Sequence, residues 1–218
     1  MKIKENKYII YMNEIFIEYN KKIKLILVGD SNVGKTTFFY KLQDKQYNYP
    51  TSTIGVDFMV MKRKYKKNKI KVCLWDTAGQ EKFKSVVNTY FREASGIILM
   101  FDLSEYSSYI NLQNWINLLD YENRCNHEHP ILLIGNKSDK KNIILNKELE
   151  KFKQKDNVIY KEICCLNVDK KSLEDLIDLL LEKILNINGI CKGVVKYNEE
   201  EEKIIEKGKN KNEKKSCC

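Results

Sequence analysis

The sequence lacks any apolar run long enough to cross a bilayer, and it contains only two prolines in 218 residues. Its longest apolar stretches, such as residues 97–101, have the length of a buried strand, whereas a spanning helix needs about 20 apolar residues. Any attachment to a membrane must therefore use something other than a spanning helix. The length suits one α/β domain with short appendages and is too short for two domains of ordinary size.

Metal-binding and disulfide patterns are also missing. The seven cysteines are odd in number and form no C-x-x-C pair, and no secretory signal precedes them, which predicts a cytosol-facing protein with free thiols. Only two histidines occur, His127 and His129, and no second cluster of ligands accompanies them. We therefore predict a solvated loop there and not a metal site.

A basic patch interleaved with aromatic residues, which is typical of nucleic-acid binders, does not occur either. The net charge of +9 permits an anionic partner, but the lysines are scattered along the chain. We therefore predict lysines on solvated faces and no binding of nucleic acid.

The most informative stretch is residues 22–37, KIKLILVGDSNVGKTT, in which an apolar β-branched run precedes a complete G-x-x-x-x-G-K-T motif. Glycine at positions 29 and 34 lets the backbone curl and aim its N–H groups at phosphate oxygens, and the following helix adds its N-terminal dipole. Lys35 would reach the β and γ phosphates, and the Thr36 hydroxyl would bind Mg²⁺. The sequence thus predicts a nucleoside triphosphate as the ligand.

Strand and helix patterns alternate along the remaining chain, which predicts an α/β fold with a mostly parallel sheet and helices on both faces. After the phosphate loop we expect a helix to about Asp44, a loop, and two strands joined by a turn at Lys67 and Asn68. The other expected elements are strands at 57–65, 69–75, 96–101, 130–135 and 158–163 and helices at 109–121, 146–155 and 172–185.

Polar motifs follow several of these strands, where ligands of parallel sheets bind. Asp76 ends one strand just before Gly79, so it can partner Mg²⁺ while the glycine lets the backbone approach a γ phosphate. Asn136, Lys137 and Asp139 follow another strand in the order N-K-S-D. The Asp139 carboxylate can accept two hydrogen bonds from the N1–H and exocyclic amine of guanine, which adenine cannot offer, so the motif favours GTP over ATP.

The chain divides into an N-terminal extension at 1–21, a nucleotide-binding domain at 22–186 and a tail at 187–218. Apolar residues in the extension have helical spacing, which fits either an amphipathic segment or a poorly ordered one. The tail has an acidic run at 199–202 and five lysines against one glutamate at 207–215, which predicts a solvated, disordered segment.

Together these motifs resemble those of the small GTPases of the Ras superfamily, and within it of the Rab family. The likeness covers residues 22–185 and resumes at the terminal cysteines; it is carried by GDSNVGKT, TIGVDF at 53–58, WDTAGQE at 75–81, TYFREA at 89–94 and NKSD at 136–139. It implies a Ras-like G domain, a P-loop NTPase fold with a six-stranded sheet.

The resemblance implies a site for GTP or GDP with Mg²⁺ as cofactor. Thr53 would ligate the metal beside Thr36 and Asp76, and Gln80 would orient the attacking water, so that Gln80, Lys35 and Thr53 carry catalysis. Asn136 would hold its loop to the phosphate loop, and the stem of Lys137 would lie over the base. The implied nucleotide-binding residues are Ser31, Asn32, Val33, Gly34, Lys35, Thr36, Thr37, Tyr47, Thr53, Gly79, Asn136, Lys137, Asp139, Cys164, Cys165 and Leu166.

The resemblance also implies partners. Ile54, Phe58, Trp75 and Tyr90 match a surface that Rabs present to effectors, and Cys217 and Cys218 resemble a doubly geranylgeranylated Cys-Cys end. It implies a monomer, anchored to a membrane through this prenylated C-terminus, that works with a Rab escort protein, a geranylgeranyl transferase, a GDP-dissociation inhibitor, an exchange factor and an activating protein. The expected location is the cytoplasmic face of an endomembrane, such as the endoplasmic reticulum or Golgi, with cycling to the cytosol. NLQNWINLL and NGICKGV resemble the Rab branch of endoplasmic reticulum and lipid droplets.

One loop departs from the family pattern. Cys164, Cys165 and Leu166 stand where Ser-Ala-Lys is usual. The Cys165 N–H can still contact the guanine carbonyl, but we expect the bracing by the serine and the packing of the lysine on the base to be lost. Weaker binding or faster exchange would follow.

Three functions therefore compete. The first is a Rab-like GTPase that slowly hydrolyses GTP and acts as a membrane-anchored switch in vesicle trafficking. The second is a nucleotide-locked platform of the same fold that does not hydrolyse GTP, which the altered loop suggests and the intact Gln80, Lys35 and Thr53 oppose. The third, an ATP-using kinase or ATPase, is disfavoured by Asp139.

Overall fold

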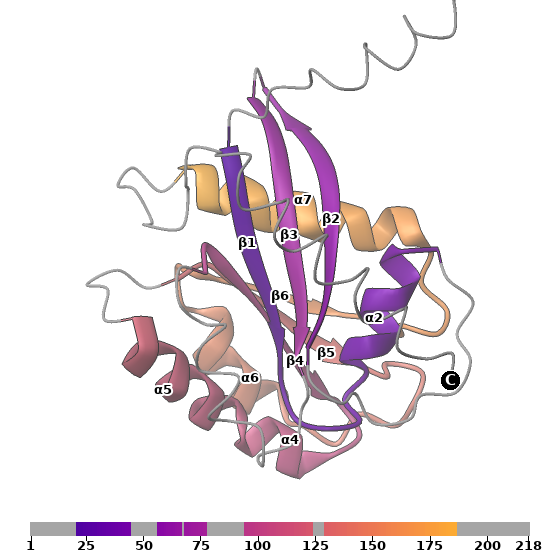
Figure 1. Ribbon diagram of the computed structural model, residues 1–218. Coiled ribbons are helices and arrows are strands. Elements are labelled where there is room, and N and C mark those ends of the chain that lie inside the picture. The colour runs from indigo at the N-terminus through magenta and orange to yellow at the C-terminus, as the bar shows by residue number, and fades with distance from the viewer. Residues whose placement is uncertain (1–20, 45–55, 67, 78–93, 124–128, 187–218) are drawn as a thin grey trace, which may run out of the picture.

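The computed structural model of the protein describes residues 21–44, 56–66, 68–77, 94–123 and 129–186. Within them, strands and helices alternate as the sequence predicts (Figure 1). The elements in chain order are β1 (Lys21–Val28), α2 (Lys35–Leu42), β2 (Val56–Tyr65), β3 (Asn68–Thr77), β4 (Gly96–Asp102), α4 (Tyr106–Ile110), α5 (Leu112–Asn123), β5 (Ile131–Asn136), α6 (Asn146–Lys153), β6 (Val158–Glu162) and α7 (Lys170–Asn186).

Six strands form one sheet in the order β2-β3-β1-β4-β5-β6. Only the β2–β3 pair is antiparallel, since these two strands are consecutive and close together in the chain; every other neighbouring pair is parallel. The predicted α/β fold with a mostly parallel six-stranded sheet is therefore confirmed.

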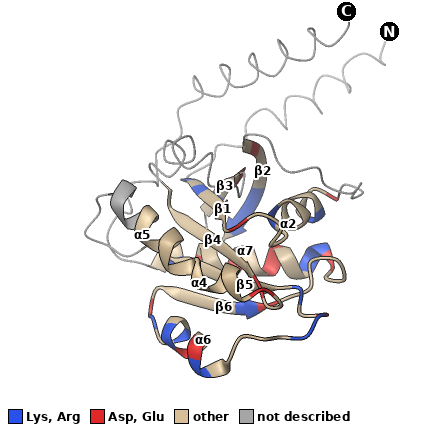
Figure 2. Cartoon of the chain, turned by 90° about the horizontal axis from the view of Figure 1, so that it is seen from below, with Lys and Arg blue, Asp and Glu red and all other residues tan. Residues whose placement is uncertain are grey.

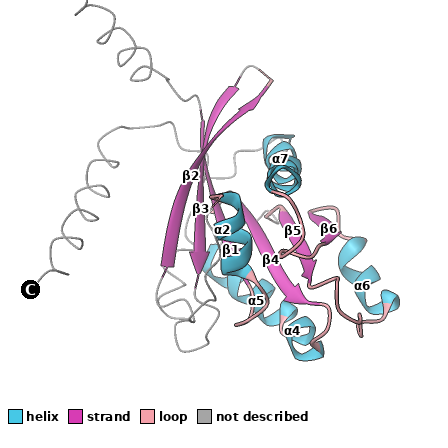
Figure 3. Ribbon diagram, turned by 90° about the vertical axis from the view of Figure 1, so that its right-hand side faces the viewer, coloured by secondary structure: helices cyan, strands magenta, loops and turns pink. Residues whose placement is uncertain are grey.

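Helices cover both faces of the sheet (Figure 3). One apolar layer joins the sheet to α2 and α7 through residues such as Phe38, Phe39 and Leu180. The other joins it to α4, α5 and α6 through Tyr109, Trp115 and other buried side chains. Because β4 and β5 are buried along their whole length, their sequences read as continuous apolar runs with no polar alternation.

The predicted single helix at 109–121 is wrong in detail, because the chain forms two helices there, α4 and α5, that meet at Asn111. Glu105 caps the first helix: its carboxylate accepts a hydrogen bond from the Ser107 N–H at 3.3 Å. The Ser108 hydroxyl donates to the Glu105 carbonyl at 2.8 Å. These local bonds let a serine-rich segment begin a helix without a long apolar stripe. Other helix ends shift by one or two residues, as at Leu42 and Lys170.

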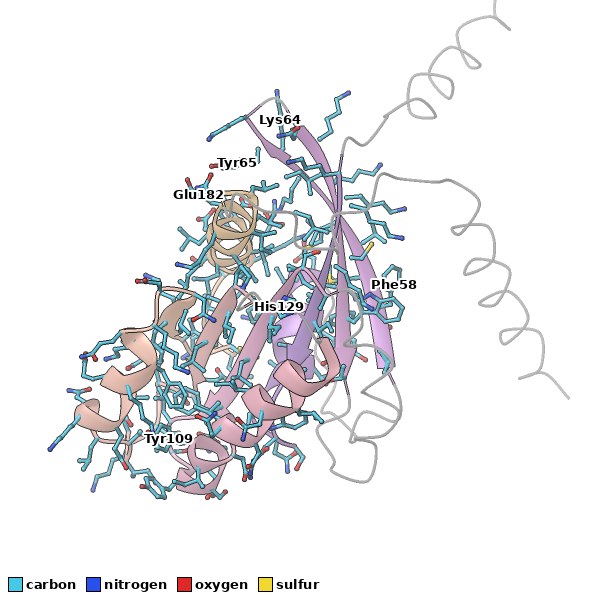
Figure 4. The ribbon with its side chains drawn as sticks, turned by 90° about the vertical axis from the view of Figure 1, so that its left-hand side faces the viewer. Phe58, Lys64, Tyr65, Tyr109, His129 and Glu182 are labelled. Atoms are coloured by element: carbon cyan, nitrogen blue, oxygen red, sulfur yellow. The ribbon has the colours of Figure 1, made fainter. Side chains whose placement is uncertain are left out.

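The predicted solvated loop around the two histidines is also partly wrong. His129 is only 9% exposed and lies just before β5 (Figure 4), so the apolar strand that follows carries it into the interior. His127 lies outside the described residues. Within the described part of the chain no three metal-ligating side chains cluster together.

Candidate nucleotide-binding site

The predicted ligand-binding motifs meet at one edge of the sheet. The phosphate loop follows β1, Asp76 lies near the end of β3, and Asn136 ends β5. Parallel strands point their carboxyl ends the same way, so segments far apart in sequence converge there.

Both glycines of the phosphate-loop motif occupy positions that strongly disfavour a side chain. Gly29 has φ +138° and Gly34 has φ +105°, values that L-residues with a Cβ rarely adopt. A Cβ on Gly29 would lie 2.1 Å from the Met100 carbonyl oxygen, and one on Gly34 would lie 2.1 Å from Asn136 Nδ2. The spacing of the motif therefore reflects two close approaches, to β4 and to the end of β5.

Lys35 is buried in the centre of this loop. Its ammonium donates hydrogen bonds to the carbonyl oxygens of Gly29 at 2.8 Å and Asp30 at 2.6 Å. Burial lowers the pKa of Lys35 to about 8, although the negative charges of Asp76 and Asp30 oppose this shift. A buried cation at the start of a helix is suited to bind phosphate oxygens.

Asp76 and Thr36 form the second charged feature of the site. The Thr36 hydroxyl donates to Asp76 Oδ2 at 2.9 Å. Burial raises the pKa of Asp76 to about 6, while Thr36 and Lys35 oppose the shift. The other oxygen, Oδ1, is buried and receives no hydrogen bond from the described part of the chain. A hydroxyl beside a carboxylate with an unsatisfied buried oxygen fits a site for Mg²⁺, which prefers oxygen ligands.

Asn136 joins three of the predicted motifs through one buried side chain. Its Nδ2 donates to the Val33 carbonyl in the phosphate loop at 2.7 Å, as the sequence analysis predicts. Its Oδ1 accepts a hydrogen bond from the Cys165 N–H at 3.0 Å. The phosphate loop and the loop after β6 are thus held by the same amide.

Lys137 has φ +62°, and its ammonium pairs with Asp102 Oδ2 at 2.6 Å. Burial by itself would raise the pKa of Asp102, but the hydrogen bonds from Lys137 and Ser104 outweigh it and lower the pKa. Asp102 therefore stays ionised and holds the stem of Lys137 beside the end of β4. Asp102 belongs to none of the predicted motifs; its position at the carboxyl end of a strand is the one signal for it in the sequence.

The expected loss of bracing and of base packing in the 164–166 loop stays a prediction. A hydrogen bond with the Cys164 side chain lowers the pKa of Asp139, the carboxylate that is predicted to read guanine. Leu166, in contrast, is 62% exposed.

Lys41 of α2 also supports this loop, and the sequence analysis missed it. Its ammonium donates to the carbonyl oxygens of Leu166 at 2.7 Å and Val168 at 2.8 Å. Lys41 is more than 120 positions away from both of these residues in the chain, and no local pattern in the sequence indicates the two contacts.

Phe58 and Trp75, two of the predicted effector residues, lie side by side on β2 and β3. Their ring centroids are 4.7 Å apart, and Lys24 Nζ lies 5.5 Å from the Trp75 ring centroid. In Figure 4 Phe58 lies on β2 far from Lys64 and Tyr65, which mark the other end of that strand. The pair is therefore at the nucleotide end of the sheet, since Trp75 precedes Asp76 by one residue on β3 and Phe58 is the cross-strand partner of Trp75 on β2.

The remaining predicted site residues fall into two groups. Ser31 and Asn32 are exposed in the phosphate loop, whereas Val33 in the same loop and Thr37 in the first turn of α2 are buried. The predictions for the others lie outside the described residues: Tyr47, Thr53, Ile54, Gly79, Gln80, Tyr90, Cys217 and Cys218.

Charges of both signs are distributed over the surface. Figure 2 shows lysine and arginine on several elements, including β2, α2 and α6, with acidic residues on α6 and α7. No helix in the described ranges has the length and apolar character of a membrane span.

Comparison with known proteins agrees with this arrangement. The model of the Ras family matches residues 24–186. Ras-related protein Rab-27B of Rattus norvegicus is 37% identical over 184 residues, covering 77% of this chain and 83% of the relative. Ras-related protein Rab-27A of Sus scrofa is 36% identical over 200 residues, covering 83% of this chain and 90% of the relative. The chain therefore belongs to the Ras family and is a Rab-like small GTPase.

Proposed function

We propose that this GTPase binds GTP and GDP through the convergent edge of its sheet and uses Mg²⁺ there. The observation that carries the proposal is the bonding of Asn136 to both the phosphate loop and the loop after β6, because it joins the phosphate and base halves of one site. Each predicted residue then has a stated role.

The phosphate half works by charge and backbone geometry. Lys35 holds the β and γ phosphates in place of its present carbonyl partners, and the backbone of residues 31–37 surrounds them with N–H groups. Thr36, Asp76 and Thr53 would hold Mg²⁺, which supplies neutralising charge at the phosphates when bound. The unsatisfied Oδ1 of Asp76 supports this assignment.

The base half selects guanine. Asp139 accepts the two hydrogen bonds that guanine offers, the stem of Lys137 covers one face of the ring, and the Cys165 N–H contacts the guanine carbonyl. The ion pair of Lys137 with Asp102 and the contact of Cys164 with Asp139 support these positions. Tyr47 is proposed to lie at the edge of the base.

Hydrolysis of GTP to GDP and phosphate is slow in such enzymes without an activating protein. Gln80 is proposed to orient the attacking water, while Thr53 and Gly79 contact the γ phosphate. Contacts that exist only with GTP make the two loops respond to the nucleotide state.

The nucleotide state is proposed to be presented to effectors by the Phe58–Trp75 pair together with Ile54 and Tyr90.

Prenylation of Cys217 and Cys218 would anchor the monomer to an endomembrane, because two lipid chains bind a membrane stably. The basic tail adds attraction for anionic lipid. The proposed protein partners are an escort protein, a geranylgeranyl transferase, a GDP-dissociation inhibitor, an exchange factor and an activating protein. Location at the endoplasmic reticulum or Golgi stays a prediction. The likeness to the Rab branch of endoplasmic reticulum and lipid droplets also stays a prediction.

The test begins with the nucleotide that co-purifies with the full chain, followed by single-turnover loss of the γ phosphate with Mg²⁺. Guanine nucleotide and slow turnover are expected, and Gln80→Leu should abolish turnover while it leaves binding intact. Gln113→Leu, a change of the same kind on the exposed face of α5, is the matched control. Bound GTP that the unmodified chain never hydrolyses would favour the nucleotide-locked platform, and equal turnover in the Gln80 variant would refute its role.

A further inference from the structure

Asp30, the second residue of the phosphate loop, makes contacts through both its backbone and its side chain. Its backbone carbonyl accepts a hydrogen bond from Lys35 Nζ at 2.6 Å. Its carboxylate accepts two further hydrogen bonds, from Asn111 Nδ2 at 2.7 Å and from Trp115 Nε1 at 2.8 Å. One residue therefore connects the phosphate-binding lysine to the junction of α4 and α5.

Trp115 is a firm support for this connection. Its side chain is only 4% exposed and packs in the apolar layer between the sheet and α5. A buried indole N–H needs an acceptor, and the Asp30 carboxylate accepts it at a distance typical of a strong bond. The indole cannot shift without disturbing the surrounding core.

Asn111 is fixed just as well, but by backbone and polar contacts. It is the C-cap of α4, its carbonyl accepts the Trp115 N–H at 3.1 Å, and its Oδ1 accepts Asn114 Nδ2 at 3.2 Å. Its remaining amide group is directed to Asp30. The break between the two helices thus creates one of the two donors.

We propose that the Asp30 carboxylate, held by Asn111 and Trp115, is a positioning group that keeps the phosphate loop in its nucleotide-binding shape and so slows nucleotide release. This inference rests on the proposed nucleotide site. A loop already held in its bound shape loses less conformational freedom when the phosphates bind, and this preorganisation increases affinity. Because the carboxylate bonds to Asn111 and Trp115 and so holds the loop itself, the anchor affects GDP and GTP alike.

The primary test is the rate of dissociation of fluorescently labelled GDP and GTP from full-length Trp115→Phe. This variant removes the indole N–H and keeps an aromatic ring in the core. Release of both nucleotides should be faster by about three- to tenfold, the effect of one ordinary hydrogen bond. Asn111→Ala should act in the same direction, and Asp30→Ala, which removes both acceptors, should have a larger effect than either.

Two controls separate positioning from stability. Ile116→Val trims the neighbouring core residue on α5 without touching the loop, and it should lower the melting temperature while leaving release unchanged. Asp30→Asn keeps a carbonyl oxygen that can accept the indole N–H. It should therefore accelerate nucleotide release by no more than half as much as Asp30→Ala does.

A spectroscopic measurement tests the same connection without kinetics. The chain has two tryptophans, so Trp115→Phe identifies the indole N–H resonance of Trp115 in a ¹⁵N correlation spectrum. This resonance should shift when GDP binds to the unmodified chain and should not shift in Asp30→Ala.

Unchanged release in Trp115→Phe and Asp30→Ala, or equally fast release in Ile116→Val at matched stability, would overturn the inference. A chain that binds no guanine nucleotide at all would instead refute the proposed site, which the co-purified nucleotide reveals first. The two failures are therefore distinguishable.

Discussion

The proposed phosphate end and the proposed guanine end of the site are constructed differently. At the phosphate end, the ionisable side chains of Lys35 and Asp76 are themselves buried. At the guanine end, the loop after β6 carries Cys164 and Leu166 in place of the usual side chains, yet the Cys165 N–H still bonds Asn136.

From this difference we expect the contacts at the two ends to tolerate sequence change differently. Charge and backbone conformation at the phosphate loop depend on residue type, because a lysine or a left-handed glycine has no substitute there. A loop that acts through a backbone N–H needs only to be held in place, and Asn136 and Lys41 can do this whatever its own side chains are.

The largest effect should come from Lys35→Met, which keeps most of the side-chain volume and removes the charge. Nucleotide affinity should fall by about 100-fold or more, because two charge-assisted hydrogen bonds to phosphate contribute roughly 1.5–3 kcal/mol each. Titration calorimetry with GDP measures the loss. The nucleotide-free chain should stay folded, since removing a buried charge offsets the two lost bonds to carbonyls. Binding within threefold of the unmodified chain would show that the phosphate end does not depend on Lys35.

The pH dependence of GDP binding should separate the two charges of the phosphate end. Above pH 8 Lys35, with its pKa lowered to about 8, loses the charge that attracts phosphate. Below pH 6 Asp76, with its pKa raised to about 6, becomes protonated and cannot support Mg²⁺. Affinity should therefore be greatest between these values and fall by up to about tenfold per pH unit outside them.

Calorimetry at several pH values, with and without Mg²⁺, tests this expectation. Without Mg²⁺ the decrease in GDP affinity below pH 6 should disappear, while the decrease in GDP affinity above pH 8 should remain. A flat profile on both sides would contradict the assigned roles.

Lys41→Ala should expose the dependence of the guanine end on its support. Without the ammonium, two loop carbonyls lose their donor, and GDP should dissociate about three- to tenfold faster, as for a hydrogen bond of roughly 0.5–1.5 kcal/mol. Stopped-flow release of labelled GDP measures it. Lys147→Ala removes one positive charge from an exposed site on α6 and is the matched control; equal acceleration in both variants would indicate a general charge effect.

The smallest effects should follow changes of the loop's own side chains. Cys164→Ala removes the contact to Asp139 and should speed GDP release by about threefold, whereas Cys164→Ser should stay within about twofold of the unmodified chain because a hydroxyl can donate in place of the thiol. Leu166→Lys should slow release by about twofold by packing its stem on the base. The same stopped-flow assay applies, and effects above tenfold would mean that the loop side chains, and not their supports, determine binding.

Much of the fold followed from local patterns. Three features can be predicted from the sequence: the apolar runs that become β4 and β5, the glycine spacing of the phosphate loop, and the N-K-S-D motif. They can be predicted because strands and loops of this kind need particular residues in fixed order. The split between α4 and α5 was not predicted, because the first helix depends on capping by Glu105 and Ser108 and has no apolar stripe. The burial of His129 was missed because a polar neighbourhood in sequence says little about the strand that follows.

The sequence by itself determined the α/β fold, the phosphate loop with its lysine and hydroxyl, and the family to which the chain belongs, because these depend on residue types at short, fixed spacings. Only the tertiary structure decided which distant groups meet: Asn136 with Val33 and Cys165, Lys41 with the loop after β6, and Asp30 with Asn111 and Trp115. Such contacts join residues up to 127 positions apart, and their partners are set by strand order and helix packing, which no local pattern encodes.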